Sequence, residues 1–439
     1  MSPEANAQKS DTRGLLMLLW SIIMAGAQVS FEIPLVVKIT EFYKITDADF
    51  GLLLGLTTFF MAAATAPWGY AADKYQRIKL ILISQAIIAA SLVLAGVCFE
   101  LRLPYAVFFA LKLLCGIGMA GIGPVATSAV IDTVPLVKRG AAFGWVGVAW
   151  VMGGAFGMLL PAACMSLHLS LGVTFFIGGI IGTAFTFALF FVKEPKRGAQ
   201  DEALKDFVGA DKAEYGHRIR LSDLKALLKK PANILLVFAM LFFQFPQQAI
   251  TLWFITFLMR NHGLKEFIAT QLMFLTFLGM PIGNAFGGAW TDRAFKKKRT
   301  GRTRVMIVMA IFAPLFLIAA MALPFNWLVF APLMILTNFF IVASGPGLTT
   351  VSLEVNLPEH RGTISAILAL FSNIARALAW YFPPLIAAAF AGRYDRAFML
   401  TAVFSFPLVA VYILMTLRIE KDLDFVNNTL KDRTKEFNH

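Results

Sequence analysis

The stretch Gly69-Tyr-Ala-Ala-Asp73-Lys74-Tyr-Gln-Arg77-Ile-Lys79 is the most informative part of this sequence. It separates an apolar run over about 49–72 from another over about 79–98, and each run is long enough to cross a bilayer as a helix of about 20 residues. Charged residues at so short a junction belong at the membrane surface, because the bilayer interior disfavours charge. The stretch is therefore predicted to be a tight loop between two transmembrane helices.

Composition extends this prediction to the whole chain. Hydrophobic residues make up 58% of the 439 residues and charged residues 15%, against roughly 45–50% and 25% in soluble proteins. Mean hydropathy is +0.72. These values exclude soluble enzymes, nucleic-acid binders and disordered scaffolds, and they predict an all-α membrane protein. We expect twelve transmembrane helices, at about 14–38, 49–72, 79–98, 104–131, 140–163, 170–192, 232–259, 267–291, 304–323, 326–351, 362–390 and 396–417.

The basic residues predict the orientation. Thirty of the 39 Lys and Arg residues fall on the side that holds both termini, seven fall on the other side, and two lie within spans. Because Lys and Arg are retained on the cytoplasmic side, both termini are predicted to be cytoplasmic, in a plasma membrane of bacterial type. The same asymmetry accounts for most of the net charge of +13 without nucleic acid as a partner.

The longest polar stretch divides the chain in two. We expect an N-terminal six-helix bundle at 1–192, a cytoplasmic linker at 193–231, a C-terminal six-helix bundle at 232–417 and a cytoplasmic tail at 418–439. Within the linker, Ser222–Lys230 is predicted to be a short helix at the membrane interface, because leucines alternate there with lysines.

The two halves are related in sequence. Five residues of the first half recur 222 positions later, namely Pro124, Asp132, Arg139, Gly140 and Pro161 as Pro346, Glu354, Arg361, Gly362 and Pro383. The opening stretch itself recurs 219 positions later as Gly288-Ala-Trp-Thr-Asp292-Arg293. Duplicated six-helix halves are typical of alternating-access carriers, whose substrate site lies near the midplane between the halves.

These motifs carry a family resemblance. Gly69-x3-Asp73-Lys74-x2-Arg77-x-Lys79 resembles the loop signature of the major facilitator superfamily, and Gly288–Arg299 resembles its degenerate second copy. Lys112-x3-Gly116-x-Gly118 resembles the fourth-span signature, with Lys where Arg is usual. The resemblance implies the major facilitator fold of two pseudo-symmetric halves, secondary active transport by alternating access, membrane lipids as surroundings and a monomer.

A narrower resemblance is to the spinster-type branch, whose members export lysophospholipids and sphingoid lipids. Leu252-Trp253-x2-Thr256-Phe257-Leu258-x-Arg260-x-His262-Gly263 is similar to its seventh-span exit. Two departures limit what the resemblance implies. The first span lacks the usual Asp-Arg pair and has only Glu32 nearby, and Met119 stands where the branch usually has Glu. The coupling and headgroup chemistry of that branch therefore does not carry over whole.

Charged residues at the cytoplasmic helix ends are interpreted as a gate whose ion pairs form in one state and part in another. The alternative is that they only set topology and anchor headgroups. The residues of this predicted gate are Gly69, Asp73, Arg77, Asp132, Arg139, Gly288, Asp292, Glu354 and Arg361.

Three ionisable residues lie well within spans, and such residues are costly unless they serve a function. Glu32 is interpreted as the proton-coupling group, and Lys112 and Arg376 as substrate-binding cations. A carboxylate in low dielectric favours its neutral form unless a cation pairs with it, so an anion competing for Lys112 would couple binding to protonation. The alternative is a structural Glu32–Lys112 salt bridge. Arg376 has no obvious partner other than a substrate anion or Asn373.

Amides and aromatic rings complete the predicted binding group, which favours an organic anion or an amphipathic zwitterion, lysophospholipid-like molecules included, as the small-molecule substrate. Its members are Lys112, Arg376, Gln28, Gln244, Gln247, Gln248, Asn338, Asn373, Trp253 and Trp380.

The sequence lacks the motifs for metal binding within a span and for ATP binding. No His pair has metal-ligand spacing within a span, and no Gly-x4-Gly-Lys-Ser/Thr loop is present. Gly345-Pro346-Gly347 is interpreted as a helix break. We therefore expect no cofactor, no metal and no enzymatic activity. The leading prediction is a proton-coupled transporter; a proton-driven multidrug exporter and a transporter-like receptor without flux remain open as alternatives.

Overall fold

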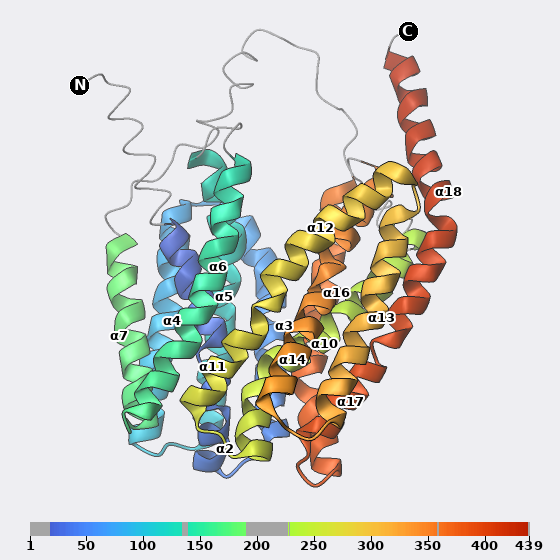
Figure 1. Ribbon diagram of the computed structural model, residues 1–439. Coiled ribbons are helices and arrows are strands. Elements are labelled where there is room, and N and C mark those ends of the chain that lie inside the picture. The colour runs from blue at the N-terminus through green and yellow to red at the C-terminus, as the bar shows by residue number, and fades with distance from the viewer. Residues whose placement is uncertain (1–17, 134–138, 190–226, 228, 358–359, 438–439) are drawn as a thin grey trace, which may run out of the picture. The chain divides into compact units, whose positions relative to one another are not determined.

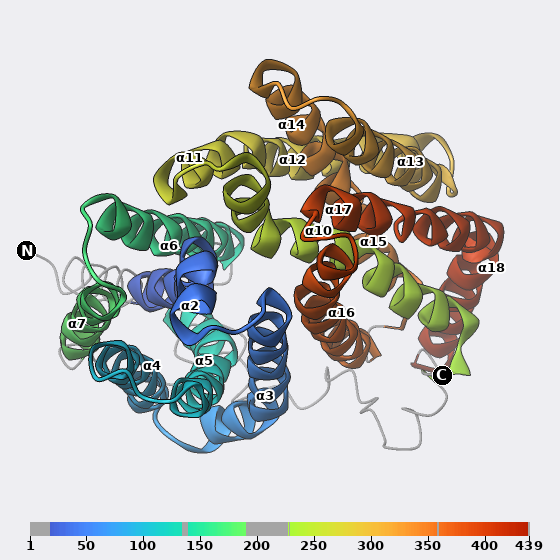
Figure 2. The ribbon, with the colours of Figure 1, turned by 90° about the horizontal axis from the view of Figure 1, so that it is seen from below.

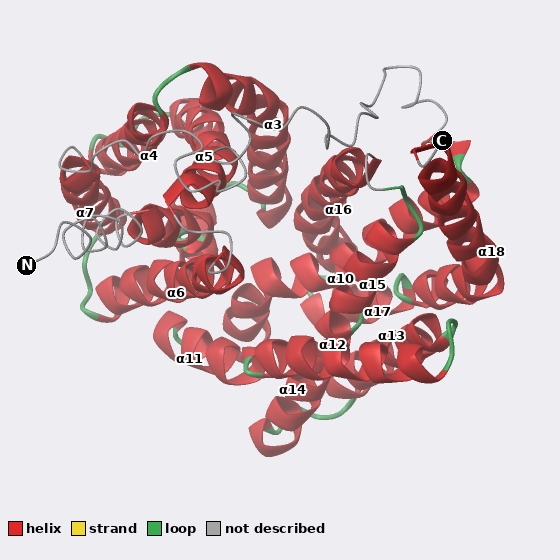
Figure 3. Ribbon diagram, turned by 90° about the horizontal axis from the view of Figure 1, so that it is seen from above, coloured by secondary structure: helices red, strands yellow, loops and turns green. Residues whose placement is uncertain are grey.

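The computed structural model describes residues 18–133, 139–189, 227, 229–357 and 360–437. This part of the chain is helical and contains no strand (Figure 3). Eleven of its helical segments are long and apolar enough to cross a membrane, and Leu171–Ala184 is a shorter apolar helix. The predicted all-helical membrane fold is confirmed.

The chain divides into two compact units of similar size. Unit 1 consists of Met1–Glu214 with Leu264–Thr270, and unit 2 consists of Tyr215–Gly263 with Gln271–His439. The predicted interfacial helix at 222–230 lies almost entirely outside the described residues.

Unit 1 is a bundle in which α4 packs against both α5 and α7, and α3 packs against α5 (Figure 2). Its first span is interrupted, because helical residues 18–30 are followed by a 3-10 turn before the helix resumes. The labelled elements are η1 Ile33–Leu35, α2 Val36–Tyr43, α3 Asp47–Lys74, α4 Arg77–Glu100, α5 Tyr105–Thr133, α6 Arg139–Ser166 and α7 Leu171–Leu189.

Unit 2 contains two further interrupted spans. One breaks at Leu278 and the other at Ser344, immediately before the predicted break at Gly345-Pro346-Gly347. The elements are α10 Pro231–His262, α11 Glu266–Phe277, α12 Gly279–Lys297, α13 Gly301–Ala322, α14 Trp327–Ala343, α15 Gly345–Glu354, α16 Arg361–Ala389, α17 Tyr394–Val403 and α18 Phe406–Phe437. The residues of α11 up to Thr270 are counted with unit 1.

The last helix differs from the predicted tail. α18 continues about five turns beyond the predicted end of the span at 417 (Figure 1). Ile419 and Leu423 belong to the hydrophobic core of unit 2, and Val426, at helical spacing from them, is also buried. Asp424 Oδ1 lies 2.5 Å from Arg299 Nη1. An apolar stripe thus holds this extension against its own unit.

Glycines bring α12 and α14 into backbone contact. A Cβ added at Gly279, Gly283 or Gly287 would lie 2.1, 2.2 or 1.9 Å from a backbone oxygen of α14. Small residues four apart permit this approach, which is a common way for membrane helices to associate. Among the described residues, Gly69 has no neighbour within 4 Å of such a Cβ, and Gly288 has only Pro346, at 3.6 Å. The close backbone contacts are therefore made by Gly279, Gly283 and Gly287, and not by the motif glycines Gly69 and Gly288.

This backbone contact between α12 and α14 predicts a difference between two Gly→Ala substitutions on α12. Gly283→Ala drives a methyl group into the Phe339 carbonyl and should lower the free energy of unfolding by about 1–3 kcal/mol, as overpacking does. Gly288→Ala should stay within about 0.5 kcal/mol, as changes away from tight packing do. Thermal unfolding of the purified variants in neutral detergent measures this difference in stability. Equal unfolding midpoints would contradict the close contact between α12 and α14.

Candidate functional site

A buried ion pair lies inside unit 1. Glu32 Oε1 is 2.5 Å from Lys112 Nζ, and the two side chains are only 5% and 7% exposed. Glu32 sits at the interruption of the first span, where its carbonyl accepts a hydrogen bond from Leu35 N at 2.9 Å. Lys112 lies in the third turn of α5. The broken helix thus places a carboxylate against the one lysine of α5, and each ion neutralises the other.

Further polar groups border the pair. Gln28 lies one helical turn before Glu32, and its buried Nε2 has no hydrogen-bond partner among the described residues. Gln28 also lines a cavity of about 30 Å³ together with Gln85. That volume is close to the share of one water molecule in the liquid. The ion pair therefore has a polar border on the Gln28 side.

Arg376 is another cation within a span; its side chain is half-buried, and its surroundings differ from those of Lys112. It lies in α16, 15 residues after Arg361 and so roughly 22 Å along the helix. Its Nε is buried without a hydrogen-bond partner, and among the described residues no acidic side chain forms an ion pair with it. Since Arg cannot shed its proton in proteins, the charge of Arg376 is left uncompensated.

Arg376 shares one face of α16 with Asn373 and Trp380, because residues three and four apart lie together on a helix. Trp380 is 9% exposed, and its indole Nε1 also lacks a hydrogen-bond partner in the described part of the chain. This face therefore presents unused hydrogen-bond donors, from a guanidinium and an indole. Such a face suits an acceptor group such as a carboxylate, sulfonate or phosphate.

Two predicted binding residues are engaged inside unit 2. Trp253 is fully buried, donates from Nε1 to the Trp380 carbonyl at 3.1 Å and stacks on Tyr394 at 5.8 Å. Asn338 is fully buried, and its Nδ2 donates to the carbonyls of Thr276 and Met334. Both side chains link helices of unit 2 to one another and are not exposed to a cavity.

Of the three predicted glutamines around Pro246 on α10, Gln247 lines a cavity of about 570 Å³ in unit 2, beside Asn284 and Thr349. Gln244 and Gln248, which lie before and after Gln247 along α10, are half-buried. The volume lies in the range of small-molecule sites, roughly 300–1,000 Å³. An amide group within such a cavity can orient a polar part of a ligand.

The charged residues of the second loop form a cluster around Arg302, which the sequence analysis missed. Arg302 Nη2 donates to Asp292 Oδ1 at 2.9 Å, and Nη1 donates to Glu354 Oε1. The guanidinium also lies 4.1 Å from the centre of the Phe295 ring. Asp292 and Glu354 therefore share one arginine of their own half.

A shift of 219 residues aligns Arg77 with Lys296 and so conceals Arg302. Arg77 is the first residue of α4, and Arg302 is the second residue of α13, the corresponding third helix of its half. Comparing helix starts instead of a fixed offset would have found Arg302. Arg77 itself is 8% exposed. The predicted gate side chains of Asp73, Asp132, Arg139 and Arg361 lie outside the part of the chain whose side chains are described.

Fold, buried charges and duplicated loops together define a membrane transporter. The family model of the Major Facilitator Superfamily matches residues 18–380, and the chain belongs to that superfamily. Its members are transporters and not enzymes, as predicted.

Solved structures show the same fold. A bacterial homologue of the human lysosomal transporter Spinster, in an inward-facing and unoccupied conformation, aligns with a TM-score of 0.79 at 20% identity, over 94% of this chain and 98% of that one. The nucleoside transporter NupG aligns with a TM-score of 0.70 at 15% identity, over 92% and 99% of the two chains.

Relatives in sequence include transporters with different substrates. Protein spinster homolog 1 of Xenopus tropicalis is 27% identical over 56% of this chain and 46% of the relative, and the multidrug resistance protein MdtG of Salmonella typhi is 27% identical over 52% of each. The chain thus matches about half the length of these two relatives. The probable sulfoacetate transporter SauU of Cupriavidus necator is 23% identical over 88% of this chain and 89% of the relative.

The Glu32–Lys112 pair predicts strong coupling between two substitutions. Lys112→Met or Glu32→Gln alone leaves one partner without its counterpart, and breaking a buried pair typically costs about 3–5 kcal/mol. The double variant Glu32→Gln/Lys112→Met removes both charges and should be more stable than Lys112→Met alone. A double-mutant cycle by thermal unfolding measures the coupling; additive effects would show that the two side chains do not interact.

Proposed function

We propose that this protein is a secondary active transporter that works by alternating access, is coupled to protons, and moves an organic anion or an amphipathic zwitterion. The observation that carries the proposal is the uncompensated guanidinium of Arg376 on α16, which is half-buried, has a buried Nε without a hydrogen-bond partner, and has no ion-pair partner among the described residues. A buried charge is stable only when it is paired and hydrogen-bonded. We propose that an anionic group of the substrate supplies this pairing.

The balance of buried charges supports an anionic substrate. Lys112 is neutralised by Glu32 at 2.5 Å, whereas Arg376 adds a positive charge beside an unused indole donor on Trp380. Asn373 on the same helix face, and Gln247 with its neighbours on α10, provide amides for the rest of the ligand. The substrate expected from these groups has one anionic headgroup and an apolar part.

The ion pair supplies the proposed coupling to protons. While Lys112 faces Glu32, the carboxylate is held in its charged form by the adjacent cation. A substrate anion that attracts Lys112 removes that stabilisation and leaves the carboxylate in low dielectric, where its neutral form is favoured. Substrate binding and proton uptake by Glu32 then occur together.

The relatives are consistent with this class of substrate. The probable sulfoacetate transporter, which aligns along most of both chains, is named for an organic anion. The multidrug resistance relative favours the alternative of a proton-driven multidrug exporter. Arg376 would repel a cationic drug, and the Glu32 carboxylate is already paired with Lys112, so these charges disfavour that alternative. A receptor without flux is the other alternative.

The remaining expectations follow the same reasoning. We propose that the protein acts as a monomer in a bacterial inner membrane, with both termini in the cytoplasm and the Arg302 cluster at the cytoplasmic surface. Asp292 and Glu354 then serve as gate residues together with Arg302, whose guanidinium they share. Surface arginines at these helix ends fit the excess of positive charge on the cytoplasmic side.

Uptake into proteoliposomes tests the proposed role of Arg376. Sulfoacetate, succinate, lysophosphatidylcholine and the cationic dye ethidium are offered to wild type, Arg376→Gln and Arg376→Lys. Loss of charge-assisted hydrogen bonds worth about 1.5–3 kcal/mol should reduce the uptake efficiency of the carried anion about 10–100-fold in Arg376→Gln. Arg376→Lys keeps the charge and should retain more activity.

Two results would contradict the proposal. One is wild-type protein that carries only ethidium, and the other is Arg376→Gln that carries the anion as well as wild type does. Specific binding of an anion without uptake would favour the receptor alternative.

A further inference from the structure

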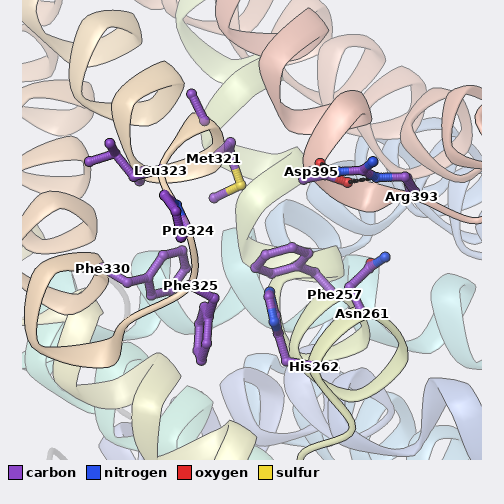
Figure 4. A pocket seen from close by; sticks show the side chains of 12 residues that line it. Phe257, Asn261, His262, Met321, Leu323, Pro324, Phe325, Phe330, Arg393 and Asp395 are labelled. Atoms are coloured by element: carbon purple, nitrogen blue, oxygen red, sulfur yellow. Dashed lines mark hydrogen bonds and ion pairs between the residues drawn. The ribbon is translucent and has the colours of Figure 1, made fainter.

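A second cavity lies within unit 2, at the end of α13 that is opposite to Arg302. Figure 4 shows the side chains that line it. Its volume is about 420 Å³, within the range of small-molecule sites. The last turn of α10, the turn between α13 and α14, and the first residues of α17 form its walls. None of its residues belongs to the binding group proposed above.

One wall of the cavity is aromatic. The His262 ring stacks on Phe325 with centroids 3.8 Å apart and meets Phe257 edge-on at 4.9 Å. Phe330 lies behind Phe325, with ring centroids 5.1 Å apart. Figure 4 shows these rings together at one side of the cavity. Flat apolar ligands bind against the open face of such a stack, because aromatic stacking adds to the free energy of burying apolar surface.

The facing wall carries Arg393, at the end of a turn that Asn261 holds by hydrogen bonds. Asn261 holds the turn before α17, since its Nδ2 donates to the Gly392 carbonyl at 3.3 Å and its Oδ1 accepts from Tyr394 N at 3.2 Å. Ala391 and Gly392 in this turn have φ of 55° and 80°. A left-handed alanine is uncommon and is tolerated only where surrounding contacts hold it. The turn therefore presents Arg393 in a fixed place.

The charged side chains at this wall carry a net positive charge. Arg393 donates from Nε and Nη2 to Asp395 at 3.2 and 2.6 Å, and Arg396 Nε lies 3.9 Å from the same carboxylate. Two guanidinium groups thus share one carboxylate, and the remaining N–H groups of Arg393 are not used by it. His262 faces the same cavity with no hydrogen bond from another described residue.

We propose that this cavity is a second ligand site, separate from the transport site, for a flat aromatic or apolar monoanion. The ring system of the ligand stacks on His262 and Phe325, and its carboxylate or sulfonate accepts hydrogen bonds from Arg393. The site is independent of the proposed transport function, because it requires neither Arg376 nor the Glu32–Lys112 pair.

Calorimetric titration of the full-length protein in dodecyl maltoside tests the site with naphthalene-2-sulfonate and its neutral analogue naphthalene-2-sulfonamide. Wild type should bind the sulfonate saturably and about tenfold or more tightly than the sulfonamide, as expected for charge-assisted hydrogen bonds. Arg393→Gln should abolish that preference. Phe325→Ala should weaken both ligands.

The matched control is Arg396→Gln, three residues further on in the first turn of α17, which should keep the wild-type dissociation constant within about twofold because Arg396 shares the Asp395 carboxylate but does not line the cavity. If Arg393→Gln does not fold, Arg393→Gln/Asp395→Asn removes both charges of the pair and should show the same loss of preference.

Three results would overturn the proposal: no saturable binding of the sulfonate, no preference over the sulfonamide in wild type, or an equal loss in Arg396→Gln. Arg376→Gln should bind the sulfonate as wild type does. Loss of binding in that variant would assign the ligand to the transport site instead.

Discussion

The structure depends on the cost of placing an ion where water is absent. A charged side chain at the centre of a bilayer is unfavourable by about 2.5 kcal/mol or more, so each such residue needs a partner or a function. The first span meets this constraint by breaking its helix at Glu32, which brings the carboxylate to Lys112. α16 does not meet it, since Arg376 has no ionic partner in the part of the chain that is described. We propose that this difference between the halves gives them different roles despite the duplicated sequence.

Close helix packing and interrupted helices also lie beside the groups that we propose take part in binding or coupling. Glycines four apart on α12 let its backbone touch α14, and the span that contains α14 breaks at Ser344. The backbone there borders the cavity that holds Gln247. Interrupted helices beside cavities are typical of transporters, because freed backbone groups are tolerated only where they meet protein or a cavity. The interruptions at Glu32 and at Ser344 therefore both lie next to groups that we propose take part in binding or coupling.

Hydropathy and charge were sufficient to predict the helical spans, because about 20 apolar residues in a row have few alternatives to crossing a membrane. They were also sufficient to single out Glu32, Lys112 and Arg376, since charge is rare within spans. The extension of α18 was not predicted, because the apolar stripe of Ile419, Leu423 and Val426 is diluted by charged neighbours. Arg302 was missed because the two loops differ in length. Trp253 and Asn338 were predicted to bind substrate and are fully buried within unit 2; that burial could not be predicted, because a sequence does not show which face of a helix packs against its own unit.

The most direct test of this account measures proton uptake when substrate binds. Purified protein in weakly buffered detergent solution is titrated with an organic anion that it transports, and the change in pH is recorded for wild type and for Glu32→Gln. We predict that wild type takes up about one proton per bound anion, because a carboxylate without its paired cation favours the neutral form. Glu32→Gln should bind the anion without proton uptake. Binding to wild type without proton uptake, or uptake that persists in Glu32→Gln, would contradict the account.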